Sequence, residues 1–545
     1  MPTRRMFVSA LAGGIATTVM LRPGDLRAAE PVVVETASGR LQGLRDAGAV
    51  SFRGIPYAYD TAGSNRFMAP RPVTKWAGVR EAINYGPRSP QGPGIPGAVP
   101  PPGPPPRYGE DCCVLNVFTP DLNRNARRPV MFWIHGGGFQ VGSGEVDGTN
   151  LAKFGDVVVV GVNHRLNVFG YTHLGFLDSD FADSANVGQL DLIAALKWVR
   201  TNISQFGGDP ANVTVIGQSG GGSKITALQV MPQSKGLFER AINMSGSSGF
   251  SLKKPADEER VSIELLKVLG LERGALRKLQ TVPSDQLIAA SQKAIVNAQG
   301  ESARPMVDGH NIAHAPLSPE GLAMHASMPA IFSVTSTESA FILGMDKRNL
   351  TVTADQVRSR IANTYGFDDT KAQEILVGYT KDDPARTPFD VLLAASSEAW
   401  VRAAMHRGIA AKAALGKAPA YMLDFNWKTD PVLGAPHAAD IPYAFGNQVS
   451  GDNTYGQYFP NLSPEAQIVA TNEMSTFVAF ARTGHPNNAR VPTWQPYDLE
   501  RRATLVMEQQ PRIVDDFRGN DRRTSESLPP IDPMGVSRSA LFRAS

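Results

Sequence analysis

Cysteine is nearly absent from this sequence of 545 residues, which contains only Cys112 and Cys113. Adjacent cysteines can form a disulfide only with a distorted peptide geometry, so the sequence excludes a fold built on a disulfide framework. No cysteine and histidine residues have the spacing of a metal site. We therefore expect no bound metal, and no motif in the sequence indicates a cofactor.

An excess of charge of one sign is also lacking. The chain has 54 basic and 51 acidic residues, and removing residues 1–29 leaves 50 of each, because that segment holds four arginines and one aspartate. No basic stripe indicates binding to nucleic acid, and no acidic tail indicates a strongly charged partner.

The longest apolar run near the N-terminus, residues 7–21, is interrupted by two glycines and is too short to span a membrane comfortably. The pair Arg4-Arg5 precedes it, and Ala28 and Ala29 supply small residues for cleavage. This order predicts a twin-arginine signal peptide over residues 1–29. An amphipathic helix is the alternative, but no polar face is visible. We expect a bacterial protein that is periplasmic or secreted, without a stable membrane anchor.

A hydrophobic content of 42% with 19% charged residues is typical of a soluble globular protein. No linker divides the middle of the chain, so we predict one domain over residues 30–515. The remaining tail, residues 516–545, is rich in arginine, serine and proline. We expect this tail to be partly disordered.

Short apolar runs alternate with longer helical stretches along the chain. Strands are expected at 115–118, 130–134, 157–162, 213–216, 238–244, 328–334, 420–425 and 504–507, and helices at 188–206, 465–483 and over much of 253–299 and 354–414. This alternation predicts an α/β fold with a large, mostly parallel twisted sheet and helices on both faces. Runs at 32–36 and 39–43 predict an antiparallel N-terminal edge.

Residues 86–106 are rich in proline and glycine, so they can form neither a helix nor a central strand. A surface loop is the simpler interpretation, and a loop at the mouth of an active site is the alternative.

A serine stands at the centre of Gly217-Gln218-Ser219-Gly220-Gly221, between the strand at 213–216 and a stretch that can continue as a helix. A Gly-x-Ser-x-Gly motif between strand and helix is typical of the nucleophile elbow of an α/β-hydrolase. An ordinary glycine-containing loop is the alternative, because the chain has 52 glycines.

A second motif, His135-Gly136-Gly137-Gly138, directly follows the strand at 130–134. Consecutive glycines allow backbone N–H groups to point at one spot, which is the geometry of an oxyanion hole. A flexible turn is the alternative. Together, the two motifs favour acyl transfer from a serine.

A catalytic serine needs a histidine as base and an acid that orients this histidine. In α/β-hydrolases the chain order is nucleophile, acid, histidine. Residue type alone does not choose among the histidines that follow Ser219, which are His310, His314, His325, His406, His437 and His485.

The chain resembles the type-B carboxylesterase/lipase family, which includes bacterial para-nitrobenzyl esterases and, more distantly, cholinesterases. The resemblance lies in short segments along nearly the whole chain after the signal: the elbow and residues 110–117, 163–170, 202–210, 305–309 and 480–486. It implies a catalytic triad of Ser219, Glu338 and His437. It also implies that the backbone N–H groups of Gly137, Gly138 and Gly220 form the oxyanion hole.

Two other acids, Asp308 and Asp440, are rival triad members, but each fits better as a turn or cap residue. The sequence also departs from the family. Gln218 stands where the family commonly has glutamate, and Gly220 replaces the usual alanine, which should loosen the elbow. No cysteine precedes Cys112, so the family's first disulfide loop cannot form, and the proline-rich segment lacks the tryptophan that holds choline in cholinesterases.

We therefore expect a carboxylic-ester hydrolase that acts on a small-molecule ester through an acyl-enzyme intermediate, as a monomer or homodimer. Hydrolysis of amides, carbamates or thioesters by the same triad is an alternative. A non-catalytic binding protein on this fold is less expected, because all three triad residues are present.

Overall fold

The computed structural model describes residues 29–543 except 47, 93–104, 448–462, 534, 536 and 537. The signal predicted at 1–29 lies outside the described residues, apart from its last position. So does most of the proline-rich segment.

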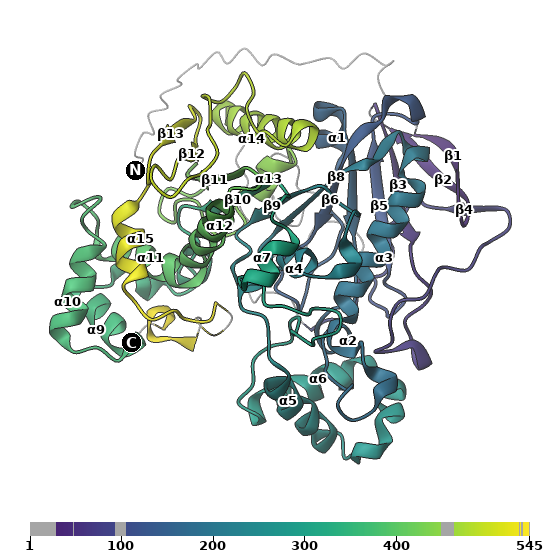
Figure 1. Cartoon of the computed structure of the whole chain (residues 1–545), viewed down its shortest axis with the longest axis horizontal. Coiled ribbons are helices and arrows are strands. Elements are labelled where there is room, and N and C mark those ends of the chain that lie inside the picture. Colours follow the sequence, from purple (N-terminus) through teal and green to yellow (C-terminus); the bar gives the residue numbers. More distant parts are fainter. Residues whose placement is uncertain are drawn as a thin grey trace, which may run out of the picture.

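A thirteen-stranded sheet forms the centre of the described chain, in the order β1-β2-β3-β5-β7-β6-β8-β9-β10-β11-β12-β13, with β4 beside β2 (Figure 1). The strands are β1 Glu30–Thr36, β2 Gly39–Asp46, β3 Ala49–Pro56, β4 Val79–Glu81, β5 Val114–Thr119, β6 Arg128–Ile134, β7 Val158–Val162, β8 Gly208–Gln218, β9 Arg240–Met244, β10 Ala330–Thr335, β11 Ala420–Phe425, β12 Thr504–Met507 and β13 Arg512–Val514. Neighbouring strands from β7 to β12 are parallel, whereas β1, β2, β3 and β5 pair in antiparallel fashion. The mostly parallel sheet and its antiparallel N-terminal edge confirm the prediction.

The helices lie around this sheet. They are α1 Thr149–Gly155, α2 Asn167–Gly170, α3 Val187–Asn202, α4 Gly220–Gln229, α5 Pro255–Val268, α6 Ser284–Asn297, α7 Pro319–Met324, α8 Ala340–Leu343, α9 Ala354–Tyr365, α10 Asp369–Gly378, α11 Pro388–Ser397, α12 Ala403–Leu415, α13 Ile441–Ala444, α14 Pro464–Thr483 and α15 Gly519–Glu526. A short π-helix, Glu398–Arg402, joins α11 to α12.

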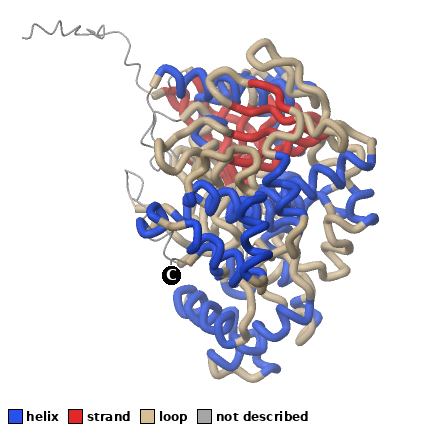
Figure 2. The backbone as a smooth tube through the Cα atoms, turned by 90° about the vertical axis from the view of Figure 1, so that its left-hand side faces the viewer, coloured by secondary structure: helices blue, strands red, loops and turns tan. Residues whose placement is uncertain are grey.

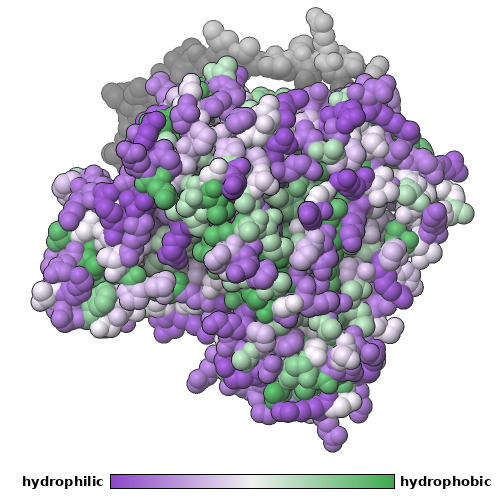
Figure 3. Space-filling view, in the orientation of Figure 1, coloured by the Kyte–Doolittle hydropathy of each residue, from purple (hydrophilic) through white to green (hydrophobic). Residues whose placement is uncertain are grey.

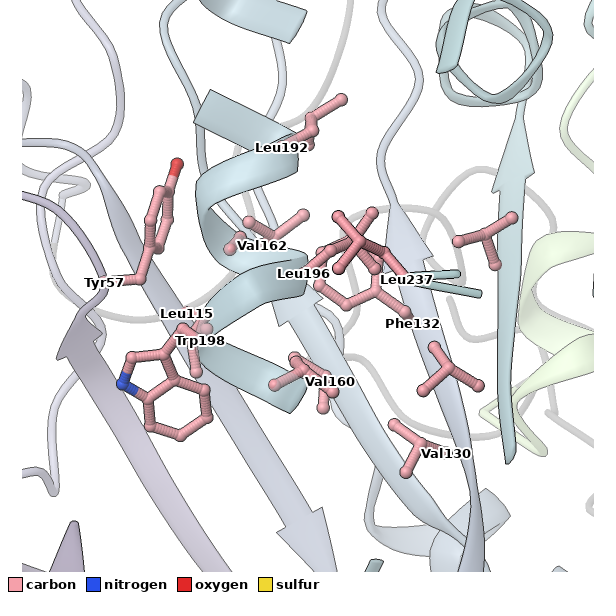
Figure 4. Close-up of a cluster of buried hydrophobic side chains, with 14 of the residues drawn as sticks. Tyr57, Leu115, Val130, Phe132, Val160, Val162, Leu192, Leu196, Trp198 and Leu237 are labelled. Atoms are coloured by element: carbon pink, nitrogen blue, oxygen red, sulfur yellow. The ribbon is translucent and has the colours of Figure 1, made fainter. Parts of the chain in front are cut away.

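Both faces of the central part of the sheet are covered, which explains why strands such as β6, β7 and β10 are buried along their whole length. Successive side chains point to opposite faces of a strand, so Phe132 packs in a core with α3 and α4, whereas Trp133 packs in a second core with α13 and α14. In the first core, Leu192 and Leu196 of α3 share one apolar cluster with the strand residues Val160 and Val162, and the close-up shows the helix in front of these strands (Figure 4).

Two groups of helices extend away from the sheet. The pair α5 and α6 packs around one apolar cluster, and α9, α10 and α11 pack around another. Figure 2 shows these helices below the strands. In Figure 3, hydrophilic residues cover much of the face, and hydrophobic residues gather near its centre and toward its lower end. No helix in the described part of the chain has both the length and the apolar character needed to span a bilayer.

The tail after Asp515, which was expected to be partly disordered, is folded over most of its length. Arg386 pairs with the buried Asp521 of α15 at 2.7 Å, and Leu541 and Phe542 are buried in the cluster around α9. In the described part of the tail, a charged side chain thus has a partner and apolar residues are buried.

Candidate active site

Ser219 occupies a strained turn between the end of β8 and the start of α4. Its backbone φ of 56° and ψ of −123° lie outside the regions that most L-residues adopt. The Ser219 N–H donates to the Met244 carbonyl of the neighbouring strand β9 at 2.7 Å. A Cβ at Gly221 would overlap the carbonyl oxygen of Ile134 at the end of β6. The predicted strand–turn–helix arrangement is therefore present, and close packing against β6 requires glycine in it.

His437 and Glu338 lie in contact, although 99 residues separate them in the sequence. The His437 Nδ1–H donates to Glu338 Oε2 at 2.5 Å, because the carboxylate can only accept. Ser245 Oγ and the Thr335 N–H donate to the other carboxylate oxygen at 2.6 and 2.8 Å. Burial acts to raise the Glu338 pKa, but His437 and these hydrogen bonds outweigh it and lower the pKa. The arrangement leaves His437 Nε2 as the acceptor.

The acceptor nitrogen of His437 faces Gln218. The amide nitrogen of Gln218 lies 3.2 Å from His437 Nε2 and donates to it. Ser219 and His437 line the same cavity, but no hydrogen bond joins their side chains in the described structure. The structure thus brings the three predicted triad residues to one place and forms only the His437–Glu338 contact among them. The sequence shows Gln218 only as a departure from the family, and no motif predicts its contact with the histidine.

The cavity has a volume of about 230 Å³. Ile342, Trp400, Val401 and Pro533 form its apolar wall, and the remaining lining residues are Gly138, Ser219, Gly220, Ser245, Ser247, Ser248 and His437. The Trp400 ring also lies 4.6 Å from the His437 ring, centre to centre. A cavity of this size with one apolar side can accept a small ester beside the serine. Pro533 belongs to the C-terminal tail, and no motif in the sequence predicts that this tail reaches the site.

The glycine turn after β6 packs directly against the elbow. A Cβ at Gly136 would lie 3.0 Å from the Gln218 carbonyl oxygen. Gly137 and Gly138 have φ of 81° and 61°, values that favour glycine. Within the described chain, the N–H groups of Gly137, Gly138 and Gly220 donate to no protein acceptor. Three unused donors therefore lie close to Ser219, at the positions that the resemblance implies for an oxyanion hole.

Neither rival acid forms a hydrogen bond or an ion pair with His437 in the described structure. Asp308 accepts hydrogen bonds from Asn186 and from the backbone N–H groups of His310 and Ile312, as a turn residue does. Asp440 is buried at the N-terminus of α13, and burial and the charge of Glu338 raise its pKa to about 7. Glu338 is thus the acid that holds the histidine.

Lys224, in the first turns of α4, also belongs to the site, although no sequence motif includes it. Its Nζ donates to the His135 and Gly138 carbonyl oxygens, at 3.1 and 3.0 Å. A lysine in a glycine-rich helix start gives no sequence signal for such a contact, because the contact depends on how closely α4 approaches the turn after β6.

Comparison with known proteins matches residues 30–524 to the model of the "Carboxylesterase family". The chain is 33% identical to the para-nitrobenzyl esterase of Bacillus subtilis (strain 168) over 514 residues, which cover 90% of this chain and 98% of the relative. It is 32% identical to the phenmedipham hydrolase of Pseudarthrobacter oxydans over 486 residues, which cover 87% of this chain and 94% of the relative. A crystal structure of a Geobacillus stearothermophilus carboxylesterase at pH 6.2 is similar with a TM-score of 0.77 and 34% identity, covering 90% of this chain and 99% of that chain. These similarities confirm the α/β-hydrolase fold.

Proposed function

The chain belongs to the carboxylesterase family, and we propose that it hydrolyses carboxylic esters through an acyl-enzyme formed on Ser219. The observation that carries the proposal is the buried contact between His437 and Glu338 at the cavity that holds Ser219. A histidine held in this way is oriented as a general base for a serine nucleophile.

In the first half-reaction, Ser219 Oγ attacks the ester carbonyl carbon and His437 Nε2 takes the hydroxyl proton. The carbonyl oxygen becomes an oxyanion and accepts from the N–H groups of Gly137, Gly138 and Gly220. The bond to the leaving oxygen then breaks, and His437 returns the proton to the departing alcohol. In the second half, water attacks the acyl group with His437 as base, and Ser219 leaves as a hydroxyl.

His437 Nε2 has one lone pair, so it cannot accept from the Gln218 amide and from the Ser219 hydroxyl at the same time. The Gln218 amide must therefore release this nitrogen when the ester binds. Catalytic hydrogen bonds are often unformed in unliganded sites and tighten in the complex. Glu338 keeps the proton on Nδ1 throughout, and its carboxylate stabilises the imidazolium that forms in each half-reaction.

The same residues can also cleave amides, carbamates or thioesters. Turnover of an ester and an amide with matched acyl and leaving groups distinguishes these activities. A non-catalytic binding role is less supported, because such a role needs neither the strained serine nor the oriented histidine.

The direct test is Ser219→Ala with p-nitrophenyl esters and a fluorophosphonate probe. We expect loss of hydrolysis and of covalent labelling in a protein that remains folded, and normal activity for the control Ser64→Ala at an exposed position. Full ester turnover by folded Ser219→Ala would refute the mechanism.

We also propose export through the twin-arginine route, since Arg4-Arg5 precedes a short apolar run. Replacing both arginines with lysine should retain the protein in the cytoplasm of its host, as measured by cell fractionation. Unchanged export would contradict the proposal. A monomeric or homodimeric state stays a prediction.

A further inference from the structure

The amino group of Lys224 is fully buried beside the turn Gly136–Gly138. Its side chain is inaccessible to solvent, and burial lowers its pKa to about 7. No acidic side chain in the described chain forms an ion pair with it. The Phe139 ring lies 5.3 Å from Nζ, and the only hydrogen bonds that Nζ makes in the described structure go to two backbone carbonyl groups. A lysine buried without a carboxylate is costly, so its two contacts need an explanation.

The two carbonyl groups bracket the oxyanion donors. The His135 carbonyl belongs to the peptide before Gly136, and the Gly138 carbonyl belongs to the peptide after Gly138. The N–H groups of Gly137 and Gly138 lie on the two peptides between them. Three consecutive glycines have wide conformational freedom. One side-chain nitrogen, Lys224 Nζ, bound at 3.1 and 3.0 Å to both ends of this turn fixes the direction of the donors in between.

Gly220 contributes the space that this contact needs. A Cβ at Gly220 would overlap the Gly138 carbonyl oxygen. The Gly138 carbonyl therefore fits between the Lys224 amino group and the Gly220 Cα. The turn after β6 fills the room that a methyl group at position 220 would take.

We propose that Lys224 is a positioning residue that holds the turn Gly136–Gly138 through the His135 and Gly138 carbonyl groups, with Gly220 as its required neighbour. The proposal rests on the function proposed above, since it assigns Lys224 to the oxyanion hole of that reaction. Lys224 itself does not touch the substrate.

The test compares Lys224→Met, Gly220→Ala and the double variant. Loss of one oxyanion donor costs on the order of 10²- to 10³-fold in rate, so we expect each single variant to lose kcat in this range. KM for a p-nitrophenyl ester should change little. Affinity for a trifluoromethyl ketone, which forms a tetrahedral oxyanion on the serine, should fall in parallel with kcat.

Both substitutions act on the same carbonyl group, so their effects should not multiply. We expect the kcat of the double variant to be about as low as that of the less active single variant, because the two residues act through one group. Losses that multiply would show that Lys224 and Gly220 act independently and would overturn the shared role.

Lys412 offers a matched control. It is also buried, and its Nζ donates to the His325 and Ala326 carbonyl oxygens at 2.9 and 3.3 Å, outside the cavity. Lys412→Met should leave kcat and ketone affinity unchanged. An equal loss of kcat in Lys412→Met, or wild-type kcat and ketone affinity in Lys224→Met, would overturn the proposal.

If Lys224→Met does not fold, Lys224→Gln keeps a donor for one carbonyl group and should give an intermediate kcat, and Gly220→Ala is measured independently. Wild-type kcat in both folded variants would overturn the proposal. If Ser219→Ala is inactive while Lys224→Met is fully active, only this inference fails. If Ser219→Ala stays active, the proposed function fails.

Discussion

Replacing Gln218 with glutamate places a carboxylate beside the proposed base. The Gln218 amide nitrogen lies 3.2 Å from His437 Nε2. Two unit charges at that distance attract by about 5 kcal/mol at an effective dielectric constant of about 20, and by about 1.3 kcal/mol in bulk water. One pH unit corresponds to 1.36 kcal/mol. The attraction therefore favours the protonated imidazole by about one to four pH units, and desolvation of the new carboxylate takes back part of this gain.

A base that holds its proton more tightly is inactive up to a higher pH. We expect the acid limb of the pH profile of kcat/KM in Gln218→Glu to move upward by on the order of one unit. The assay is hydrolysis of p-nitrophenyl butyrate between pH 5 and 9, with fluorophosphonate labelling as a measure of intact sites. Glu338 and Asp440 are the other titratable groups that face the histidine, and both are unchanged in the variant.

Gln218→Met is the matched control, because it removes the amide hydrogen bond without adding charge. Its acid limb should stay closer to wild type than that of Gln218→Glu. Coincident acid limbs for wild type and Gln218→Glu, in protein that labels normally, would refute the placement of Gln218 at the base.

Three further predictions concern the triad, the core and the buried lysine. Glu338→Gln should lower kcat by up to about 10⁴-fold with little change in KM, whereas exposed Glu465→Gln should leave both constants unchanged; a loss below tenfold would contradict the role of Glu338. Asp191→Ala should lower the free energy of unfolding in urea by about 3–5 kcal/mol, because it leaves Arg165 buried without its partner at 2.6 Å; exposed Asp355→Ala should cost under about 1 kcal/mol, and equal losses would argue against burial as the cause. The Lys224 pKa is about 7 in the folded protein, whereas the ordinary value of lysine, 10.5, applies to the unfolded chain. Between these pH values the unfolded chain therefore holds one more proton, and the free energy of unfolding rises with pH. This lysine should add up to about 1.4 kcal/mol per pH unit, and unfolding in urea at pH 7 and 9 should show a smaller rise for Lys224→Met; equal rises would contradict the lowered pKa.

The glycine turns of the site and the buried strands could be predicted from the sequence, because each requires particular residue types at neighbouring positions. The elbow and the His135-Gly-Gly-Gly turn need glycine because backbone approaches backbone closely there. The buried strands need continuous apolar residues because helices cover both faces. Each pattern involves residues that are close together in the chain, so it can be recognised as a motif in the sequence.

The choice of His437 and Glu338 needed the family resemblance, because six histidines follow Ser219 and residue type does not separate them. The contacts of Gln218 and Lys224 could not be predicted at all. Each depends on the distance between two elements that meet only in the folded chain. The same holds for β13, a short edge strand that pairs with β12 and has no periodic pattern of its own.

Pro533 in the cavity wall limits how well substrate preference can be inferred from the relatives. The family model matches residues 30–524, so part of the space that receives the substrate is shaped by residues beyond the matched region. Selectivity for acyl or alcohol size can therefore change through the end of the chain while the catalytic residues stay the same. A truncation at the family boundary removes Pro533 from the cavity wall, so substrate profiles are best compared on chains that keep this residue.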